Sequence, residues 1–241
     1  MLYNKLAKNF MLAKAIGNLS IASIVLLSLF VVASIVQLVF AFLEKEKYRR
    51  IEKPFCLALL TAFAAVTLPN HPFIYLATFA GMLGDIFVIL PNKKFFYLGA
   101  FTFFLGFVFY GIEGLSRLYA NPIPYYMIIV MVATYVVMVV VFGFFIGPRI
   151  TNNNMGDSIG IGLYLSPIFT LITIFSFLTS KVGYFMFLSL IGIIVFLSSD
   201  LTITYTKFIK KFKRYDFYIM GTYLIGQLLI VLGFVLTYLA K

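Results

Sequence analysis

Residues 17–43 read GNLSIASIVLLSLFVVASIVQLVFAFL, and no Asp, Glu, Lys or Arg interrupts them. A helix crosses the hydrocarbon core of a bilayer with about 20 mostly apolar residues, so this stretch predicts a membrane-spanning helix. It is too long for the apolar core of a secretory signal, and no small-residue cleavage site follows it. We therefore interpret it as a first span that the protein retains.

Further apolar runs follow almost to the end of the chain, and charged residues, Pro or Asn separate them. Together they predict eight spans, at about 17–43, 55–69, 73–90, 95–112, 124–147, 159–179, 182–206 and 218–240. Lipid leaves only helices and closed barrels as spanning structures, and these runs lack the alternation of barrel strands. The sequence predicts an all-α, polytopic membrane bundle of eight transmembrane helices, in one domain over residues 1–241.

The composition supports a membrane protein. Of the 241 residues, 63% are hydrophobic and 11% are charged, whereas a soluble domain has about 25% charged residues. A single Cys and a single His cannot assemble a zinc site, an iron–sulfur cluster or a disulfide framework. We expect no metal and no cofactor. The net charge is +11. The basic residues that carry it lie mostly in short loops, where they indicate membrane topology rather than nucleic-acid binding.

The distribution of Lys and Arg predicts the orientation in the membrane. With eight spans, 13 of the 19 Lys and Arg residues fall on one face, in loops 44–54, 91–94, 148–158 and 207–217. The positive-inside rule places that face in the cytoplasm and both termini outside. Three lysines before residue 15 favour the opposite orientation. We expect a multi-pass protein of the cell membrane; the sequence does not predict its oligomeric state.

Two aspartates stand inside predicted spans. Asp85 follows Gly84 in the third span, and Asp200 follows Ser199 in the seventh. A charged Asp at a helix centre costs about 2.5–3.5 kcal/mol on insertion scales, so such residues normally face the bundle interior and indicate a site. Both precede the cytoplasmic end of their span by five or six residues, or about 8–9 Å at 1.5 Å per residue. We expect them at one depth.

Other polar residues are predicted near this level. Lys53 stands at the membrane edge, and Tyr223 and Gln227 lie at similar depth in the last span. One cavity can then hold two carboxylates, an amide, a phenol and a cation. Packing roles remain open for each residue: a protonated Asp can bond a neighbouring helix, Gln227 can join two helices, and Lys53 can be an interfacial anchor.

Two further acidic residues have simpler interpretations. Glu113 and Arg117 are four residues apart, which places them on one helix face. Asp157, followed by Ser158, is interpreted as a helix N-cap.

Several motifs, in their order and spacing, resemble the YhhN-like lysoplasmalogenase family of eight-span membrane proteins over roughly residues 50–235. They are Lys53-Pro54, Gly84-Asp85, Gly99-x-x-x-Phe103-Phe104 leading to Tyr110, Gly192-x-x-x-Phe196-x-x-Ser199-Asp200 with Phe208 after it, and Tyr223-x-x-x-Gln227. The chain departs from the family at Phe107, where many members carry His.

The resemblance implies an ether hydrolase that cleaves the vinyl ether bond of lysoplasmalogens, releasing a fatty aldehyde and glycerophospho-ethanolamine or -choline. This reaction proceeds by protonation of a carbon to give an oxocarbenium ion, which water then attacks, so one acid and one anion suffice. Two carboxylates at one depth can divide these roles, and which takes which is left open. The resemblance implies catalysis by Asp85 and Asp200 and substrate binding by Lys53, Tyr110, Ser199, Tyr223 and Gln227.

Two other functions also fit a pair of intramembrane carboxylates. A proton-coupled transporter of a small molecule or lipid would place them between its repeats. An intramembrane aspartyl protease would carry Tyr-Asp and Gly-x-Gly-Asp motifs and a Pro-Ala-Leu element, whereas this chain has Gly84-Asp85, Ser199-Asp200 and no Pro-Ala-Leu. Lipid binding without catalysis is the simplest alternative.

Overall fold

A computed structural model describes residues 2–118, 125–152 and 154–240. Within these ranges the secondary structure is helical, so the predicted all-α membrane bundle is confirmed. The elements are α1 (Leu2–Gly17), α2 (Ile21–Phe42), α3 (Glu46–Thr67), α4 (Pro72–Ile89), α5 (Lys93–Leu118), α6 (Tyr125–Val140), the π-helical turn η1 (Val141–Ile146), α7 (Gly147–Ile150), α8 (Met155–Lys181), α9 (Met186–Phe208) and α10 (Tyr215–Leu239).

Seven helical segments in the described ranges are long and apolar enough to cross a membrane; α6, η1 and α7 together form one of them. The predicted count of eight is not confirmed, because α3 is not among the seven. Its first turns are charged, and its apolar part, residues 54–67, is only about 20 Å long. Helix α3 nevertheless packs against α2, α4 and α10, which bury Leu57, Leu60 and Phe63.

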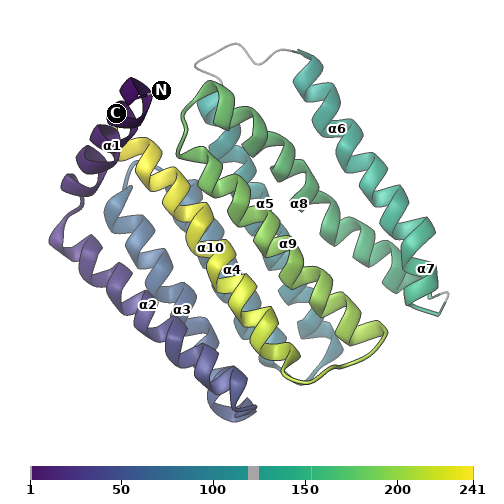
Figure 1. Cartoon of the computed structure of the whole chain (residues 1–241). Helices are drawn as coiled ribbons and strands as arrows, with labels where there is room; N and C mark the ends of the chain where they lie inside the picture. The colour runs from purple at the N-terminus through teal and green to yellow at the C-terminus, as the bar shows by residue number, and fades with distance from the viewer. Residues whose placement is uncertain (1, 119–124, 153, 241) are drawn as a thin grey trace.

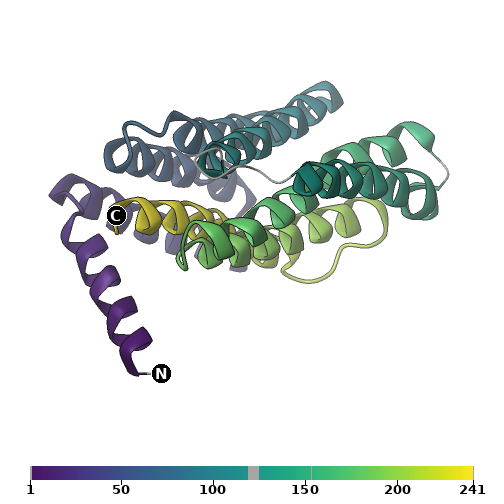
Figure 2. The same ribbon diagram turned by 90° about the horizontal axis from the view of Figure 1, so that it is seen from above.

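Several predicted boundaries differ from the structure. The first predicted span begins too early, because the Ser20 hydroxyl accepts a hydrogen bond from the Ser23 amide at 3.1 Å and caps α2. The residues before it form the separate helix α1, which leans away from the bundle in Figure 2. Helix α5 continues past the predicted end at residue 112 to Leu118. The first residue of the predicted fifth span, 124, lies outside the described ranges.

Six helices form a closed ring. Helices α3, α4, α5, α8, α9 and α10 each contact the next, and α10 contacts α3. Helix α2 packs outside the ring on α3 and α10, and α6 packs outside it on α8; they form two edges of the molecule in Figure 1. The turns that join α2 to α3, α4 to α5 and α9 to α10 lie at one end of the ring, hereafter the loop end. The predicted cytoplasmic loops all belong to this end.

Helices α9 and α10 approach closely through glycines. A Cβ atom on Gly192 would lie 2.7 Å from the Ile230 backbone nitrogen, and one on Gly226 would lie 2.9 Å from the Gly192 carbonyl oxygen. Ser189 donates a hydrogen bond to the Ile230 carbonyl at 2.8 Å across the same interface. Small residues let membrane helices approach to backbone contact, and this contact fixes α9 against α10.

We expect Gly192→Ala to destabilise the fold by about 1–3 kcal/mol, the usual cost of overpacking, because the contacted atom is backbone and cannot rotate away. Thermal unfolding in detergent measures the effect. Gly111→Ala is the matched control, since its added Cβ meets Leu171 at an ordinary 3.6 Å. Equal melting temperatures for the two variants would show that the α9–α10 contact can relax at little cost.

The opposite end of the bundle carries a polar cluster. Glu113 is buried; His71 lies 3.0 Å from its carboxylate, Tyr238 donates a hydrogen bond to it, and the Arg117 Nε atom lies 3.8 Å away. The predicted proximity of Glu113 and Arg117 is confirmed. The cluster ties the start of α4 to the ends of α5 and α10, far along these helices from the loop end.

Candidate functional site

A cavity opens inside the ring near the loop end. Its volume is about 140 Å³, and all six ring helices contribute to its lining. A buried water needs about 10–15 Å³ of such volume, so the cavity has room for several. Most of its wall is apolar, and the polar groups gather at two levels, at its inner end and at its mouth.

Asp85 is fully buried on α4, behind the cavity wall, where it contacts two lining residues, Lys53 and Tyr223. Its Oδ1 atom lies 2.8 Å from the Lys53 ammonium, and its Oδ2 atom accepts a hydrogen bond from the Tyr223 hydroxyl at 2.8 Å. Gly84 lets Phe103 close over this part of α4, because a Cβ there would lie 2.7 Å from the Phe103 ring. An ammonium and a phenol therefore surround the Asp85 carboxylate.

Asp200 reaches the same cavity from α9 and is 3% exposed. Its polar contact is with the hydroxyl of Tyr164 on α8. The charge of Lys53 also acts on Asp200, but the ion-pair contact of Lys53 is with Asp85. The Asp200 Oδ2 atom is buried and, in the described part of the chain, has no hydrogen-bond partner. One oxygen of Asp200 is thus buried with its hydrogen-bonding capacity unused by the described residues.

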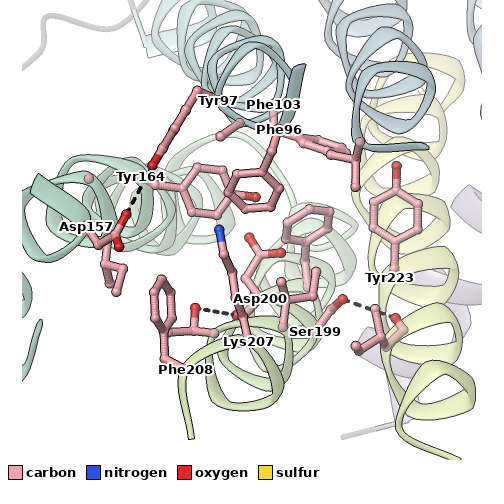
Figure 3. Close-up of a pocket in the computed structure, with 18 of the residues that line it drawn as sticks. Phe96, Tyr97, Phe103, Asp157, Tyr164, Ser199, Asp200, Lys207, Phe208 and Tyr223 are labelled. Carbon is pink, nitrogen blue, oxygen red and sulfur yellow. Dashed lines mark hydrogen bonds between the residues drawn. The ribbon is translucent and has the colours of Figure 1, made fainter. Parts of the chain in front are cut away.

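The mouth of the cavity contains charged and aromatic side chains. Tyr97 on α5 donates a hydrogen bond to Asp157 on α8 at 3.1 Å. On the α9 side, the Lys207 ammonium lies 3.2 Å from the centre of the Phe96 ring. Figure 3 shows Tyr97 and Asp157 together on one side of the cavity and the Lys207 side chain extending into it.

The structure divides the predicted site residues into two groups. The first lines the cavity and contains Asp85's partners Lys53 and Tyr223, together with Asp200 and Ser199. Ser199 donates a hydrogen bond to the Ile219 carbonyl at 3.1 Å, which joins α9 to α10. Their substrate contacts remain predictions.

The second group, Asp85, Tyr110 and Gln227, lies outside the cavity lining. Tyr110 and Gln227 are buried, and the Tyr110 hydroxyl donates a hydrogen bond to the Gln227 side-chain oxygen at 2.9 Å. This pair joins α5 to α10, as one of the packing roles anticipated for Gln227. A role of either residue in substrate binding stays a prediction.

Five polar lining residues were not predicted as site residues, namely Tyr97, Asp157, Tyr164, Thr204 and Lys207. The prediction of Asp157 as an N-cap is wrong, because the cap of α8 is Asn154, whose side chain accepts a hydrogen bond from the Asp157 amide at 3.2 Å. Asp157, Ile161 and Tyr164 follow a spacing of four and three residues, which places them on one helix face. That spacing is the feature of the sequence that links Tyr164 to Asp157.

Phe107, the position of the predicted departure from the family, is buried. It packs edge-on against Phe196 with ring centres 5.3 Å apart, and its ring centre lies 6.1 Å from that of Tyr164. Both neighbours line the cavity. Phe107 therefore packs behind two residues of the cavity wall.

The acidic residues do not suggest a metal centre. Within the described ranges, no three His, Cys, Asp or Glu side chains gather as a metal ion would require. The cationic partner of Asp85 is the Lys53 ammonium.

This architecture defines a polytopic helical membrane protein with a polar site enclosed near one end of its helix ring. The sequence profile of the YhhN family matches residues 48–234, and the chain belongs to that family. The predicted family is confirmed. Comparison with curated proteins gave no match, and comparison with solved structures gave none either.

Proposed function

We propose that the protein hydrolyses the vinyl ether bond of lysoplasmalogen-type lysophospholipids, releasing a fatty aldehyde and glycerophospho-ethanolamine or -choline. The observation that carries the proposal is a buried carboxyl in the cavity wall, Asp200, without a cation in contact, and a second buried carboxylate, Asp85, bound to the lining residues Lys53 and Tyr223. Membership of the YhhN family supports it. Because the loop end carries most of the Lys and Arg residues, we place the site on the cytoplasmic side of the cell membrane and the termini outside.

The two carboxylates have different surroundings and suit different roles. The Lys53 ammonium and the Tyr223 hydroxyl both stabilise a negative charge on Asp85. Burial disfavours the charged form of a carboxyl that has no cation in contact. We therefore assign the anion to Asp85 and the transferable proton to Asp200, whose Oδ2 atom has no hydrogen-bond partner in the described ranges.

The reaction follows from this assignment. Asp200 transfers its proton to the β-carbon of the vinyl ether, and the α-carbon becomes an oxocarbenium ion that the Asp85 carboxylate stabilises. A water adds to the α-carbon and returns a proton to Asp200. The resulting hemiacetal collapses: its hydroxyl loses a proton, the carbon–oxygen bond to glycerol breaks, and the glycerol oxygen is protonated. One water is consumed, and one aldehyde and one alcohol are formed.

The position of Lys53 changes its expected role. The resemblance implied that Lys53 binds substrate, but the ammonium lies against Asp85, and the side chain is 13% exposed. We propose that Lys53 acts mainly by holding the Asp85 charge in place, as a positioning residue. The phosphate then needs another partner.

The test is to incubate the purified protein in liposomes with an alkenyl lysophospholipid and, separately, with its alkyl-ether and acyl analogues, and to assay free aldehyde. The mechanism requires a carbon–carbon double bond to protonate, so we expect aldehyde from the alkenyl lipid alone. Passage of an unaltered lipid or solute across the liposome membrane without aldehyde would favour a transporter. Release of fatty acid from the acyl analogue would contradict the proposed bond specificity.

We expect Tyr223→Phe to lower kcat for the alkenyl lipid by about 10-fold or more, since a hydrogen bond to a charged group contributes about 1.5–3 kcal/mol. The Tyr223 hydroxyl bonds the Asp85 carboxylate. Tyr218→Phe, on an exposed position of the same helix, controls for loss of a phenol. Unchanged kcat in Tyr223→Phe would show that this hydrogen bond does not contribute to the reaction.

A further inference from the structure

The mouth of the cavity presents opposite charges from facing helices. Lys207 on α9 and Asp157 on α8 both line it, and in Figure 3 the Lys207 side chain extends into the cavity on the side away from Tyr223. The proposed reaction gives neither residue a task. Because both residues lie at the opening of the cavity, they are placed to select the molecule that enters it.

The Lys207 side suits a phosphate. Its ammonium is held 3.2 Å above the Phe96 ring centre, and the turn that follows α9 adds Lys210 and Lys211. An ammonium binds phosphate as a point charge without demanding one geometry. This wall therefore offers a fixed positive charge in a basic surface.

The Asp157 side suits an alkylammonium. The Asp157 carboxylate is half-buried and accepts a hydrogen bond from Tyr97 at 3.1 Å, which orients it. The Tyr97 ring lies beside it and is 56% exposed. A carboxylate next to an aromatic face is a favourable environment for an ammonium group.

The spacing along the helices matches a lysophospholipid. Asp200 and Lys207 are seven residues apart on α9, as are Tyr164 and Asp157 on α8, so on both walls the mouth lies about 10 Å from the inner level. In an alkenyl lysophospholipid, six bonds join the α-carbon of the vinyl ether to phosphorus and seven join the β-carbon, spans of less than about 9 Å and about 10.5 Å at bond lengths near 1.5 Å. The flexible side chains of Lys207 and Asp200 make up the difference between the helix spacing and the length of the lipid.

We propose that the cavity mouth is a subsite for a zwitterionic phospholipid head group, in which Lys207 binds the phosphate and Asp157, oriented by Tyr97, binds the ammonium. The inference rests on the proposed function, because it assumes that the lipid bond lies at Asp200 while the head group lies at the mouth. In this proposal, Lys207 and Asp157 select the substrate by its head group. A lipid without phosphate, or one with phosphate and no ammonium, should bind less well.

The test measures binding rather than turnover, with alkyl-ether lipids that the proposed reaction cannot cleave. Native mass spectrometry of the detergent-solubilised protein compares alkyl-lysophosphoethanolamine, alkyl-lysophosphatidic acid and alkylglycerol. We expect Lys207→Gln to raise Kd about 10-fold for the two phosphate lipids and to leave alkylglycerol unchanged. Asp157→Asn should raise Kd about 10-fold for the zwitterion alone. Each value corresponds to one charge-assisted hydrogen bond.

Matched variants separate the subsite from general surface charge. Lys210→Gln removes a nearby exposed Lys, and Glu52→Gln removes a carboxylate that is outside the cavity lining; both should bind all three lipids like the wild type. Lys207→Arg retains the charge and should recover most of the affinity if Lys207→Gln folds poorly.

Three results would overturn the subsite: an equal loss for alkylglycerol, equal effects of Lys207→Gln and Lys210→Gln, or displacement of the lipid by an equal concentration of free phosphoethanolamine, which would indicate a soluble ligand. Aldehyde assays on the alkenyl lipid are run in parallel. Head-group selectivity without aldehyde would refute the hydrolase and retain the subsite, whereas aldehyde release without head-group selectivity would do the reverse.

Discussion

Asp200→Asn should reduce aldehyde release from an alkenyl lysophospholipid by about 100- to 10,000-fold, the range that a positioned general acid contributes. Asparagine keeps the size of the side chain and can still accept the Tyr164 hydroxyl, but it has no proton to transfer to carbon. Because Asp200 is buried and faces the cavity, no second carboxyl of the described residues is placed to substitute for it except Asp85. That residue is held by Lys53.

Asp85→Asn should cause a loss of similar size for a different reason. The neutral amide no longer stabilises the oxocarbenium ion, and it leaves the Lys53 ammonium without its carboxylate partner. Asp216→Asn is the matched control, because Asp216 forms a 3.1 Å ion pair with Arg49 at the loop end and is not among the cavity-lining residues. Aldehyde assays are combined with thermal unfolding, so that a folding defect is recognised. Substantial activity in both cavity variants would refute catalysis by the aspartate pair.

Hydropathy reports where each helix enters and leaves the membrane, so the sequence could predict that both aspartates lie inside long apolar helices. Asp85 lies four residues before the end of α4 and Asp200 eight residues before the end of α9; Asp200 lines the cavity, and Asp85 contacts the lining residues Lys53 and Tyr223. Depth alone did not predict which neighbours they would have. Tyr110 and Gln227 are near enough in depth to bond each other, but they lie outside the cavity lining.

The site residues that the sequence analysis missed could be found only by knowing in which direction each side chain points from its helix axis. The spacing of Tyr164 from Asp157 indicates a shared helix face, but the sequence does not show what that face meets until α8 is placed beside α9. The same holds for Lys207, which in the sequence is one of five basic residues in a loop region. Helix α3 was predicted to span the membrane, but it is not among the seven long apolar helices. Its first turns are charged, and its neighbours in the bundle shield its apolar face.

Lys53→Met should lower both stability and turnover, and the double variant Lys53→Met/Asp85→Asn separates the two effects. Removing one partner of a buried ion pair leaves an uncompensated charge, which costs 3–5 kcal/mol in fully buried cases. Asp85 is fully buried but the Lys53 side chain is 13% exposed, so we expect a loss of about 2–3 kcal/mol.

The double variant carries neither charge, so its melting temperature in detergent should recover most of the loss. Its aldehyde release should stay as low as that of Asp85→Asn, because the anion is still absent. Recovery of activity together with stability would mean that Lys53 and Asp85 only hold the bundle together. A Lys53→Met protein as stable and as active as the wild type would contradict the ion pair itself.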